Sequence, residues 1–453
     1  MALALPFSLT KEVLAQMNPA RFRRRGFFQN VLVVMTSTGL AQLITICFSP
    51  VLSRVYEPGD FGIYGTFLSV AGMLSAIVTM QYSEALMLPD KDEKAAGLFW
   101  AAGFSTLVIT VLASLLWIFF PSWWKTLFKI QSLDGWLWLV PLAALVTGIN
   151  ETLTAWCARR KAFRRAATVQ VGRSVTANSG QTAAGVAGWG PGGLIGGGLF
   201  GDVLASIGLF FWVVREDGAV LRAGADRKNI LAVARQHKDF ALYSTPQNLL
   251  NATSQGAPVI LLIYYFGAAI GGIYAFAIRV LQLPMNFVLT SLRQVLFQKL
   301  SEVHNTGGDL KGLFAKTTFT LLGMSLVPAV IGFVLAPWVF GLVFGDKWGM
   351  AGEYARWLLI WLVPGFCNLP AALVGRILRQ QRNLLLFDLG LLVSRIAVLV
   401  LGGMFGTALQ TIVMFSLVGA VFNSFLIFFI WRLLNTENPA QPQGIPMTGI
   451  GMP

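Results

Sequence analysis

Long apolar stretches set the tightest limit on how this chain can fold. About 20 predominantly apolar residues form a helix that crosses the hydrocarbon core of a bilayer. The 453 residues contain about twelve such stretches, 55% of all residues are hydrophobic and only 12% are charged. We therefore predict an all-α integral membrane protein with spans at 27–52, 61–86, 96–120, 133–156, 166–189, 191–214, 241–266, 270–297, 314–345, 353–375, 383–403 and 407–431.

Basic residues are distributed unevenly between the predicted loops. Loops rich in Lys and Arg stay on the cytoplasmic side of a membrane, and a cytoplasmic N-terminus places most of the 34 Lys and Arg residues there. The external loops then hold only Arg54, Lys125, Lys129 and Lys347. Tryptophans such as Trp338 and Trp348 fall at predicted outer ends, as in an interfacial belt. Both termini are thus predicted to be cytoplasmic, and the net charge of +14 indicates topology and contact with membrane lipids, without nucleic acid.

One charged segment divides the chain almost in half. Residues 215–240 form a predicted cytoplasmic connector with six spans on either side. The predicted parts are therefore an N-terminal segment (1–26), an N-lobe (27–214), the connector (215–240), a C-lobe (241–432) and a tail (433–453).

A weak internal repeat supports this division. The stretch PVLSRVYEPGDFGIYGTFLSV (50–70) recurs as PVILLIYYFGAAIGGIYAFAIRV (258–280), so that Gly62 aligns with Gly272. An even number of spans in each half gives two parallel six-helix lobes, with the substrate path between them. Chance similarity between apolar sequences is the alternative.

The charged turn SRVYEPGD (53–60) lies between the first two spans. Pro58 presets the backbone dihedral, Gly59 relaxes the turn, and Asp60 can cap the helix that follows. Ordinary turn chemistry thus accounts for the acidic residues, whereas it gives no role to Arg54.

Polar side chains recur at helical spacing in several spans. A helix surrounded by lipid would not carry such a face, so we expect these residues either to line a polar lumen or to form hydrogen bonds between helices, each worth about 0.6 kcal/mol. The candidate lumen-lining amides are Gln42, Gln170, Asn178, Gln181, Gln247, Asn248, Asn251, Gln282 and Asn286.

Arginines in the middle of spans are more costly. Arg173, Arg279 and Arg395 each cost about 2.5 to 3.5 kcal/mol at the bilayer centre if nothing compensates their charge. They must face a water-filled cationic cavity or form structural ion pairs with buried acids such as Asp202 and Asp388. Asp388 and Arg395 lie two turns apart and can be joined through a third group.

Signatures of enzyme chemistry are missing from the sequence. There is no phosphate-binding GxxxxGK[ST] loop, and the only histidines, His237 and His304, lie in predicted loops without a partner nucleophile. The run Asp90-Lys91-Asp92 resembles the acidic pair of some glycosyltransferases, but its loop is too short for a nucleotide-binding domain. The three cysteines fall within apolar spans and predict no disulfide or metal site. We predict a transporter without catalytic residues, metal or cofactor.

The first quarter of the chain resembles a known family. The segments SPVLSRVYEPGDFGIYGTFLSVAGMLS and YSEALMLPDKDEKA are similar to the opening of Wzx-type oligosaccharide flippases, members of the multidrug/oligosaccharidyl-lipid/polysaccharide (MOP) exporter superfamily. The resemblance implies a MATE-like fold in the bacterial inner membrane. It also implies alternating-access transfer of an undecaprenyl-diphosphate-linked glycan to the periplasmic leaflet, for O-antigen, capsule or exopolysaccharide synthesis. A polysaccharide polymerase and a chain-length regulator are candidate partners.

The resemblance further implies a lumen lined with cationic side chains. Arg54 occupies the family's Ser-Arg position, and the candidate lumen arginines are Arg54, Arg173, Arg279, Arg293 and Arg395. Glu84, Asp202 and Asp388 are candidates for coupling transport to protons or sodium ions. A drug/cation antiporter of the same superfamily and a membrane glycan polymerase are the alternative functions.

Overall fold

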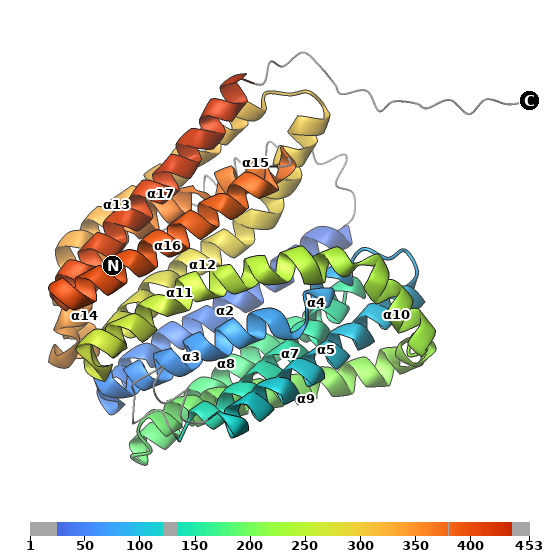
Figure 1. Cartoon of the computed structure of the whole chain (residues 1–453), viewed down its shortest axis with the longest axis horizontal. Coiled ribbons are helices and arrows are strands. Elements are labelled where there is room, and N and C mark those ends of the chain that lie inside the picture. Colours follow the sequence, from blue (N-terminus) through green and yellow to red (C-terminus); the bar gives the residue numbers. More distant parts are fainter. Residues whose placement is uncertain (1–24, 121–134, 379, 437–453) are drawn as a thin grey trace, which may run out of the picture.

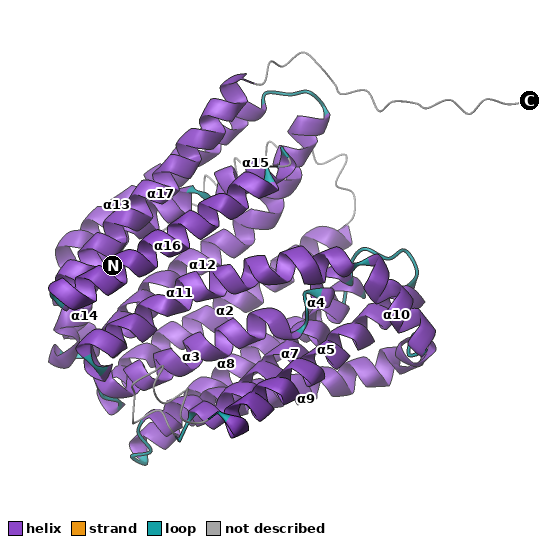
Figure 2. Cartoon of the chain, viewed as in Figure 1, coloured by secondary structure: helices purple, strands orange, loops and turns teal. Residues whose placement is uncertain are grey.

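The computed structural model describes residues 25–120, 135–378 and 380–436. The predicted N-terminal segment (1–26) and tail (433–453) lie mostly outside these residues. All regular structure in the described part of the chain is helical (Figure 2). The helices of the first half are α2 (Arg25–Val55), α3 (Pro58–Val78), α4 (Tyr82–Ala85), α5 (Asp92–Phe119), α7 (Val140–Arg159), α8 (Phe163–Val186), α9 (Pro191–Ala223) and α10 (Arg227–Gln236).

The second half begins with a short π-helical turn, Phe240–Ser244, which leads directly into α11. Its helices are α11 (Thr245–Phe266), α12 (Ala268–Asn305), α13 (Leu310–Phe344), α14 (Gly349–Cys367), α15 (Leu369–Ile377), α16 (Gln381–Phe405) and α17 (Ala408–Thr436).

Eleven helices of the described residues are long and apolar enough to cross a membrane. The fifth predicted span is the exception, because α8 is a 24-residue helix whose polar face makes its mean hydropathy too low. It still takes a place in the fold, packed against α2 and α9. The chain is therefore a multi-pass membrane protein.

Some helices extend beyond the predicted spans. The predicted connector (215–240) is largely helical, since α9 continues to Ala223 and α10 follows at Arg227. A helix rises about 1.5 Å per residue, so the nine residues that α9 adds after 214 extend it by about 13 Å. Charged side chains such as Arg215 and Glu216 suit that extension, because they favour water over hydrocarbon.

The helices form two bundles (Figure 1). In the first, α8 packs on α2 and α9, and α7 packs on α3, α5 and α9. In the second, α14 packs on α13 and α17, and α16 packs on α11 and α17. We call these the N-lobe (α2–α10) and the C-lobe (α11–α17). The lobes meet where α3 contacts α11 and α12, and where α2 contacts α12 and α13.

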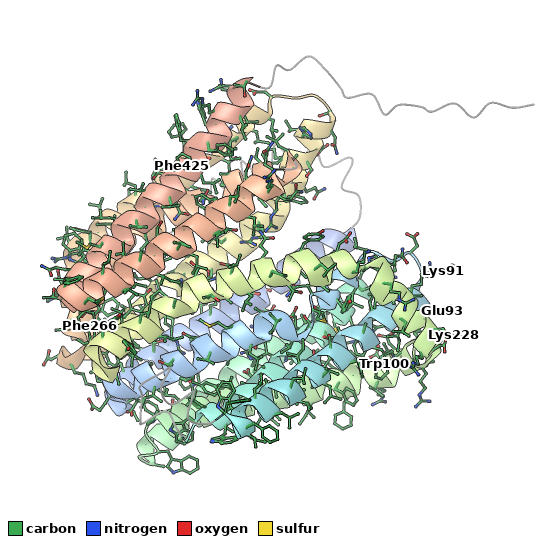
Figure 3. The ribbon with its side chains drawn as sticks, in the orientation of Figure 1. Lys91, Glu93, Trp100, Lys228, Phe266 and Phe425 are labelled. Atoms are coloured by element: carbon green, nitrogen blue, oxygen red, sulfur yellow. The ribbon has the colours of Figure 1, made fainter. Side chains whose placement is uncertain are left out.

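The two ends of the molecule differ in how the lobes are joined. We call the end with the α2–α3 turn (Tyr56, Glu57) and Gly267 the hairpin end, and the end with residues 224–239 the connector end; Figure 3 labels Phe266 at the first and Lys228 at the second. One buried core runs through both lobes and includes Phe61, Phe276 and Trp348 near the hairpin end. Towards the connector end each lobe has a core of its own. The lobes are thus joined at the hairpin end and separate at the connector end.

Ion pairs stabilise the connector end of the N-lobe. Arg160 donates to Asp92 (2.6 Å) and to the buried Asp217 (2.9 Å). Arg159 also donates to Asp92 (2.9 Å), and Trp156 donates to Asp217 (3.2 Å). These contacts tie α5, α7 and α9 together.

Candidate functional site

The two glycines of the internal repeat meet between the lobes. A Cβ atom added to Gly272 would lie 1.7 Å from the Pro58 carbonyl oxygen and 2.6 Å from the Gly62 nitrogen. A Cβ added to Gly62 would lie 2.1 Å from the Ala268 carbonyl oxygen. Only glycine lets the backbones of α3 and α12 approach this closely. The repeat detected in the sequence therefore marks the contact of equivalent helices of the two lobes.

The turn SRVYEPGD fastens the lobes together at the hairpin end. Ser53 donates to the Phe344 carbonyl (3.0 Å), and the Trp348 indole donates to the Ser53 carbonyl (2.8 Å). Lys347 donates to the Tyr56 carbonyl and to the Glu57 carboxylate, both at 2.9 Å. The predicted interfacial position of Trp348 is wrong, because this side chain is fully buried against Phe61 and Phe276.

The same turn starts α3 in a way that differs in detail from the prediction. Glu57 is the N-cap residue and Pro58 opens the helix, while Asp60 accepts a hydrogen bond from the Glu57 backbone N–H (3.0 Å). Asp60 thus closes a reciprocal capping box from the first turn of the helix. Arg54 lies in the last turn of α2, is exposed, and donates to the Pro50 carbonyl (3.4 Å).

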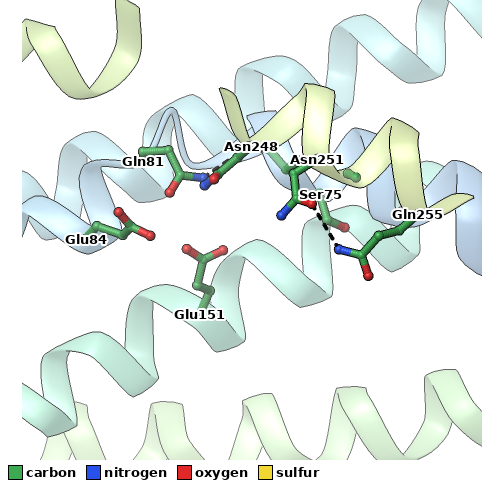
Figure 4. A pocket seen from close by; sticks show the side chains of 9 residues that line it. Ser75, Gln81, Glu84, Glu151, Asn248, Asn251 and Gln255 are labelled. Carbon is green, nitrogen blue, oxygen red and sulfur yellow. Dashed lines mark hydrogen bonds between the residues drawn. The ribbon is translucent and has the colours of Figure 1, made fainter. Parts of the chain in front are cut away.

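Towards the connector end, a polar cavity of about 310 Å³ opens between the lobes (Figure 4). The N-lobe supplies one wall from the end of α3, α4 and α7, and the C-lobe supplies the other from one face of α11. Met80 (φ 47°) and Gln81 (φ 56°) adopt the left-handed conformation that ends α3 beside this cavity. The residues that line it are Ser75, Ala76, Gln81, Glu84, Glu151, Asn248, Asn251, Ala252 and Gln255.

The charge of the cavity is negative. Glu84 and Glu151 point into it and neither forms an ion pair with the described residues (Figure 4). Ser83 donates to Glu151 (2.5 Å), and Gln255 donates to Asn251 across one turn of α11 (3.3 Å). An anion placed about 4 Å from either carboxylate would be repelled by about 4 kcal/mol at an effective dielectric constant of about 20. The cavity therefore suits hydrogen-bonding or cationic groups better than anions.

The five candidate arginines do not form one cluster. Within the described residues, no two of them share a hydrogen-bonding or aromatic partner. Arg173 on α8 forms an ion pair with Asp202 on α9, inside the N-lobe. Arg293 is exposed on α12, beyond the apolar segment Ala268–Leu289. Structural pairing thus accounts for Arg173 and occupies the coupling candidate Asp202.

Arg279 and Arg395 are the two mid-span arginines without a carboxylate partner in the described part of the chain. One Arg279 nitrogen, Nη1, is buried and has no hydrogen-bond partner there. Arg395 is 6% exposed and lies 4.7 Å from the ring centroids of both Trp361 and Phe415. It donates to the Ser254 hydroxyl on α11 (3.3 Å), whereas Asp388 interacts with Gln247, so among the described residues the two charges do not share the third group that the sequence allowed. Cation–π contacts replace an ion pair at this position.

The candidate amides fall into four groups. Asn178 and Gln181 are buried inside the N-lobe, where Asn178 donates to the Ser174 carbonyl (2.7 Å) and Gln181 to the Leu194 carbonyl (2.9 Å). Asn248 and Asn251 line the cavity, and Gln247 lies beside Asp388 on α16. The remaining four are placed on α2, α8 and α12: Gln42, Gln170, Gln282 and Asn286.

Sequence reasoning missed part of the cavity. Glu151, Gln81 and Ser75 were not among the candidate site residues, although Glu151 and Glu84 both stand near the inner ends of their spans. Gln255 continues the Asn248 and Asn251 face of α11 one turn further. The sequence did contain a signal for these residues. Glu84 and Glu151 stand near the inner ends of their spans, at the same side of the membrane as the polar residues of α11.

Solved structures share this architecture. The lipid II flippase MurJ in an inward closed conformation has a TM-score of 0.70 at 11% identity, covering 88% of this chain and 87% of that one. An inward-facing MATE family multidrug resistance transporter of the MOP superfamily has a TM-score of 0.64 at 14% identity, covering 88% and 94%. A MOP superfamily transporter from Pyrococcus furiosus, described as having a binding pocket of reverse polarity, has a TM-score of 0.56 at 12% identity, covering 90% and 94%. The chain therefore shares the two-lobed fold of these MATE, MurJ and MOP superfamily structures.

The family follows from the sequence itself. Residues 51–352, two thirds of the chain, match the family described as polysaccharide biosynthesis protein. The chain belongs to this family. No curated protein sequence matches it.

Proposed function

We propose that this protein moves a lipid-linked oligosaccharide, carried on undecaprenyl diphosphate, from the cytoplasmic to the periplasmic leaflet of a bacterial inner membrane. The observation that carries the proposal is the way the lobes are joined. They share a core at the hairpin end, whereas a polar cavity separates them towards the connector end. Such a molecule can admit a polar group from one side and release it on the other, when the joined end opens and the separate end closes.

The energetics of the substrate support this reading. A diphosphate cannot cross hydrocarbon unaided, because removing an ion from water costs far more than thermal energy supplies. Arg279 and Arg395, which lack carboxylate partners in the described residues, can replace part of its water shell through guanidinium hydrogen bonds. The lipid tail stays in the bilayer while the polar part passes between the lobes.

The distribution of basic residues supports the direction of transport. It favours a cytoplasmic connector end, so that the cavity faces the side on which the substrate is loaded. Two negative charges moving outward gain about 4 to 5 kcal/mol from an inside-negative potential of about 100 mV. The voltage thus favours export of the diphosphate.

Ion coupling belongs to the same proposal. Glu84 lines the cavity and Asp388 lies near Gln247 and Arg376, whereas Arg173 already neutralises Asp202. We expect protons or sodium ions to act at Glu84 or Asp388. Unchanged transport after neutralising Glu84, Asp202 and Asp388 together would exclude this coupling.

The decisive experiment deletes the gene in its source bacterium and determines on which leaflet the lipid-linked glycan accumulates. Accumulation facing the cytoplasm is expected, with loss of surface polysaccharide, because a downstream polymerase and chain-length regulator then receive no substrate. Restoration by the intact chain is the control. Accumulation facing the periplasm would overturn the proposal and favour a role in polymerisation.

One observation favours a second candidate, a drug/cation antiporter, because the cavity is negatively charged. Such antiporters also need aromatic side chains around the cation, and none is among the residues that line this cavity. Resistance to cationic dyes conferred by the chain, without any effect on the lipid-linked glycan, would support the antiporter.

A further inference from the structure

The walls of the cavity differ in charge. The N-lobe wall presents the carboxylates of Glu84 and Glu151, which accept hydrogen bonds, beside the neutral polar side chains of Ser75 and Gln81. The C-lobe wall presents the amides of Asn248, Asn251 and Gln255, which both donate and accept. A sugar hydroxyl can donate to one wall while accepting from the other. The cavity is therefore complementary to a ring that carries several hydroxyls.

The charges of the cavity exclude part of the proposed substrate. None of the lining residues is Lys, Arg or His. Both glutamates thus repel a diphosphate and, equally, a sugar that carries a carboxylate. The guanidinium groups of Arg279 and Arg395, by contrast, belong to helices α12 and α16 of the C-lobe. The protein therefore offers guanidinium groups to the diphosphate of a lipid-linked glycan, and carboxylate and amide groups to its sugar.

The position of the cavity suits the sugar end of the molecule. Glu151 lies eight residues before the end of α7 at Arg159, about 12 Å along the helix axis. A group in the cavity therefore sits below the connector-end surface and contacts both lobes. The volume of about 310 Å³ is at the lower end of the range for small-molecule sites, which suits one sugar-sized group and not a whole repeat unit.

We propose that this cavity binds an uncharged, hydroxyl-rich sugar ring of the lipid-linked glycan and excludes sugars that carry a carboxylate. Glu84 and Glu151 accept from its hydroxyls, and Asn251 and Gln255 complete the contacts from the other lobe. The inference rests on the proposed function, to which it adds a preference for one class of sugar.

The test measures the affinity of the full-length chain in lipid nanodiscs for three probes. They are undecaprenyl diphosphate alone, the same lipid linked to N-acetylglucosamine, and the same lipid linked to glucuronic acid. The N-acetylglucosamine probe is expected to bind at least about tenfold more tightly than the sugar-free lipid, because one or two hydrogen bonds to charged groups give a gain in affinity of that size. The glucuronic acid probe is expected to bind no more tightly than the sugar-free lipid.

Variants assign the preference to the cavity. Glu151→Gln and Glu84→Gln should each reduce the preference for the neutral over the acidic sugar by about tenfold, and should not weaken binding of the sugar-free lipid, because either change removes a charge that repels the diphosphate. Glu302→Gln, an exposed glutamate at the end of α12, is the matched control. Asn251→Ala tests the opposite wall and should weaken binding of the neutral sugar alone.

The outcomes separate this inference from the proposed function. Equal affinity of the wild-type chain for all three probes, or equal loss for all three in Glu151→Gln, would overturn the sugar site while transport of the lipid stands. Failure of the wild-type chain to bind any of the three, or to change the leaflet of the native lipid, would instead overturn the flippase proposal.

Discussion

Replacing Gly272 by alanine should disrupt the joint between the lobes. The added Cβ would lie 1.7 Å from the Pro58 carbonyl oxygen, whereas ordinary contacts begin at 3.4 Å. Because the three atoms nearest to the new methyl group are all backbone atoms, α3 and α12 must move apart by about 1.7 Å at this point, the difference between those two distances. Overpacking of this kind costs about 1 to 3 kcal/mol.

The overpacking destabilises the conformation in which the hairpin end is closed. A difference of about 1 to 3 kcal/mol between two conformations changes their ratio by about 5- to 150-fold. We expect Gly272→Ala to populate a state whose hairpin end is open and whose connector end is closed. Gly62→Ala should act in the same direction, since its Cβ would lie 2.1 Å from the Ala268 carbonyl oxygen.

Distances between spin-label pairs placed across each end, measured by pulsed electron paramagnetic resonance, provide the assay. The hairpin-end distance should lengthen and the connector-end distance should shorten. Gly59→Ala is the matched control, because nothing lies within 4 Å of its added Cβ in the same turn. Wild-type distances at both ends in a well-folded Gly272→Ala protein would refute the reasoning.

Three further substitutions test separate features. Arg395→Met should preserve or raise the melting temperature, because an apolar side chain of similar volume replaces a buried cation, but it should reduce transfer of the lipid between leaflets. A large drop in melting temperature would instead show that Arg395 has a structural role. Asp217→Ala should destabilise the chain by about 1 to 3 kcal/mol through the unpaired donors of Arg160 and Trp156, as thermal unfolding would show. Arg173→Ala should lower the melting temperature, and Arg173→Ala/Asp202→Ala should recover most of the loss, since only the single change leaves Asp202 without its partner. Equal melting temperatures of the single and the double variant would contradict the pairing.

The helical architecture could be predicted because hydrocarbon permits few alternatives. A chain segment in a bilayer must satisfy its backbone hydrogen bonds internally, so long apolar stretches translate directly into helices. Among the described helices, α8 departs from this rule, because its polar face lowers its apolarity without preventing it from packing on α2 and α9. Helix ends such as that of α9 were less predictable, because a helix can continue into water without any apolar signal.

Pairing between helices was harder to predict. The alignment of Gly62 with Gly272 indicated a repeat, but sequence alone gave no sign that the two glycines touch. Trp348 shows the same limit, since an interfacial tryptophan and one buried between lobes have identical local sequence patterns. Asp202 was among the buried acids that could pair with a mid-span arginine, but the sequence did not single out Arg173. The aromatic cage around Arg395 requires side chains from α14 and α17 that only the fold brings together.

The unequal joining of the lobes has a thermodynamic consequence for the transport cycle. Opening the hairpin end exposes Phe61, Phe276 and Trp348, at about 1.5 to 3 kcal/mol for each large apolar side chain. Closing the connector end must remove the carboxylates of Glu84 and Glu151 from solvent, which also costs free energy. The unloaded protein should therefore favour the conformation in which its cavity is accessible. A bound substrate then has to supply the free-energy difference before the lobes adopt the opposite conformation.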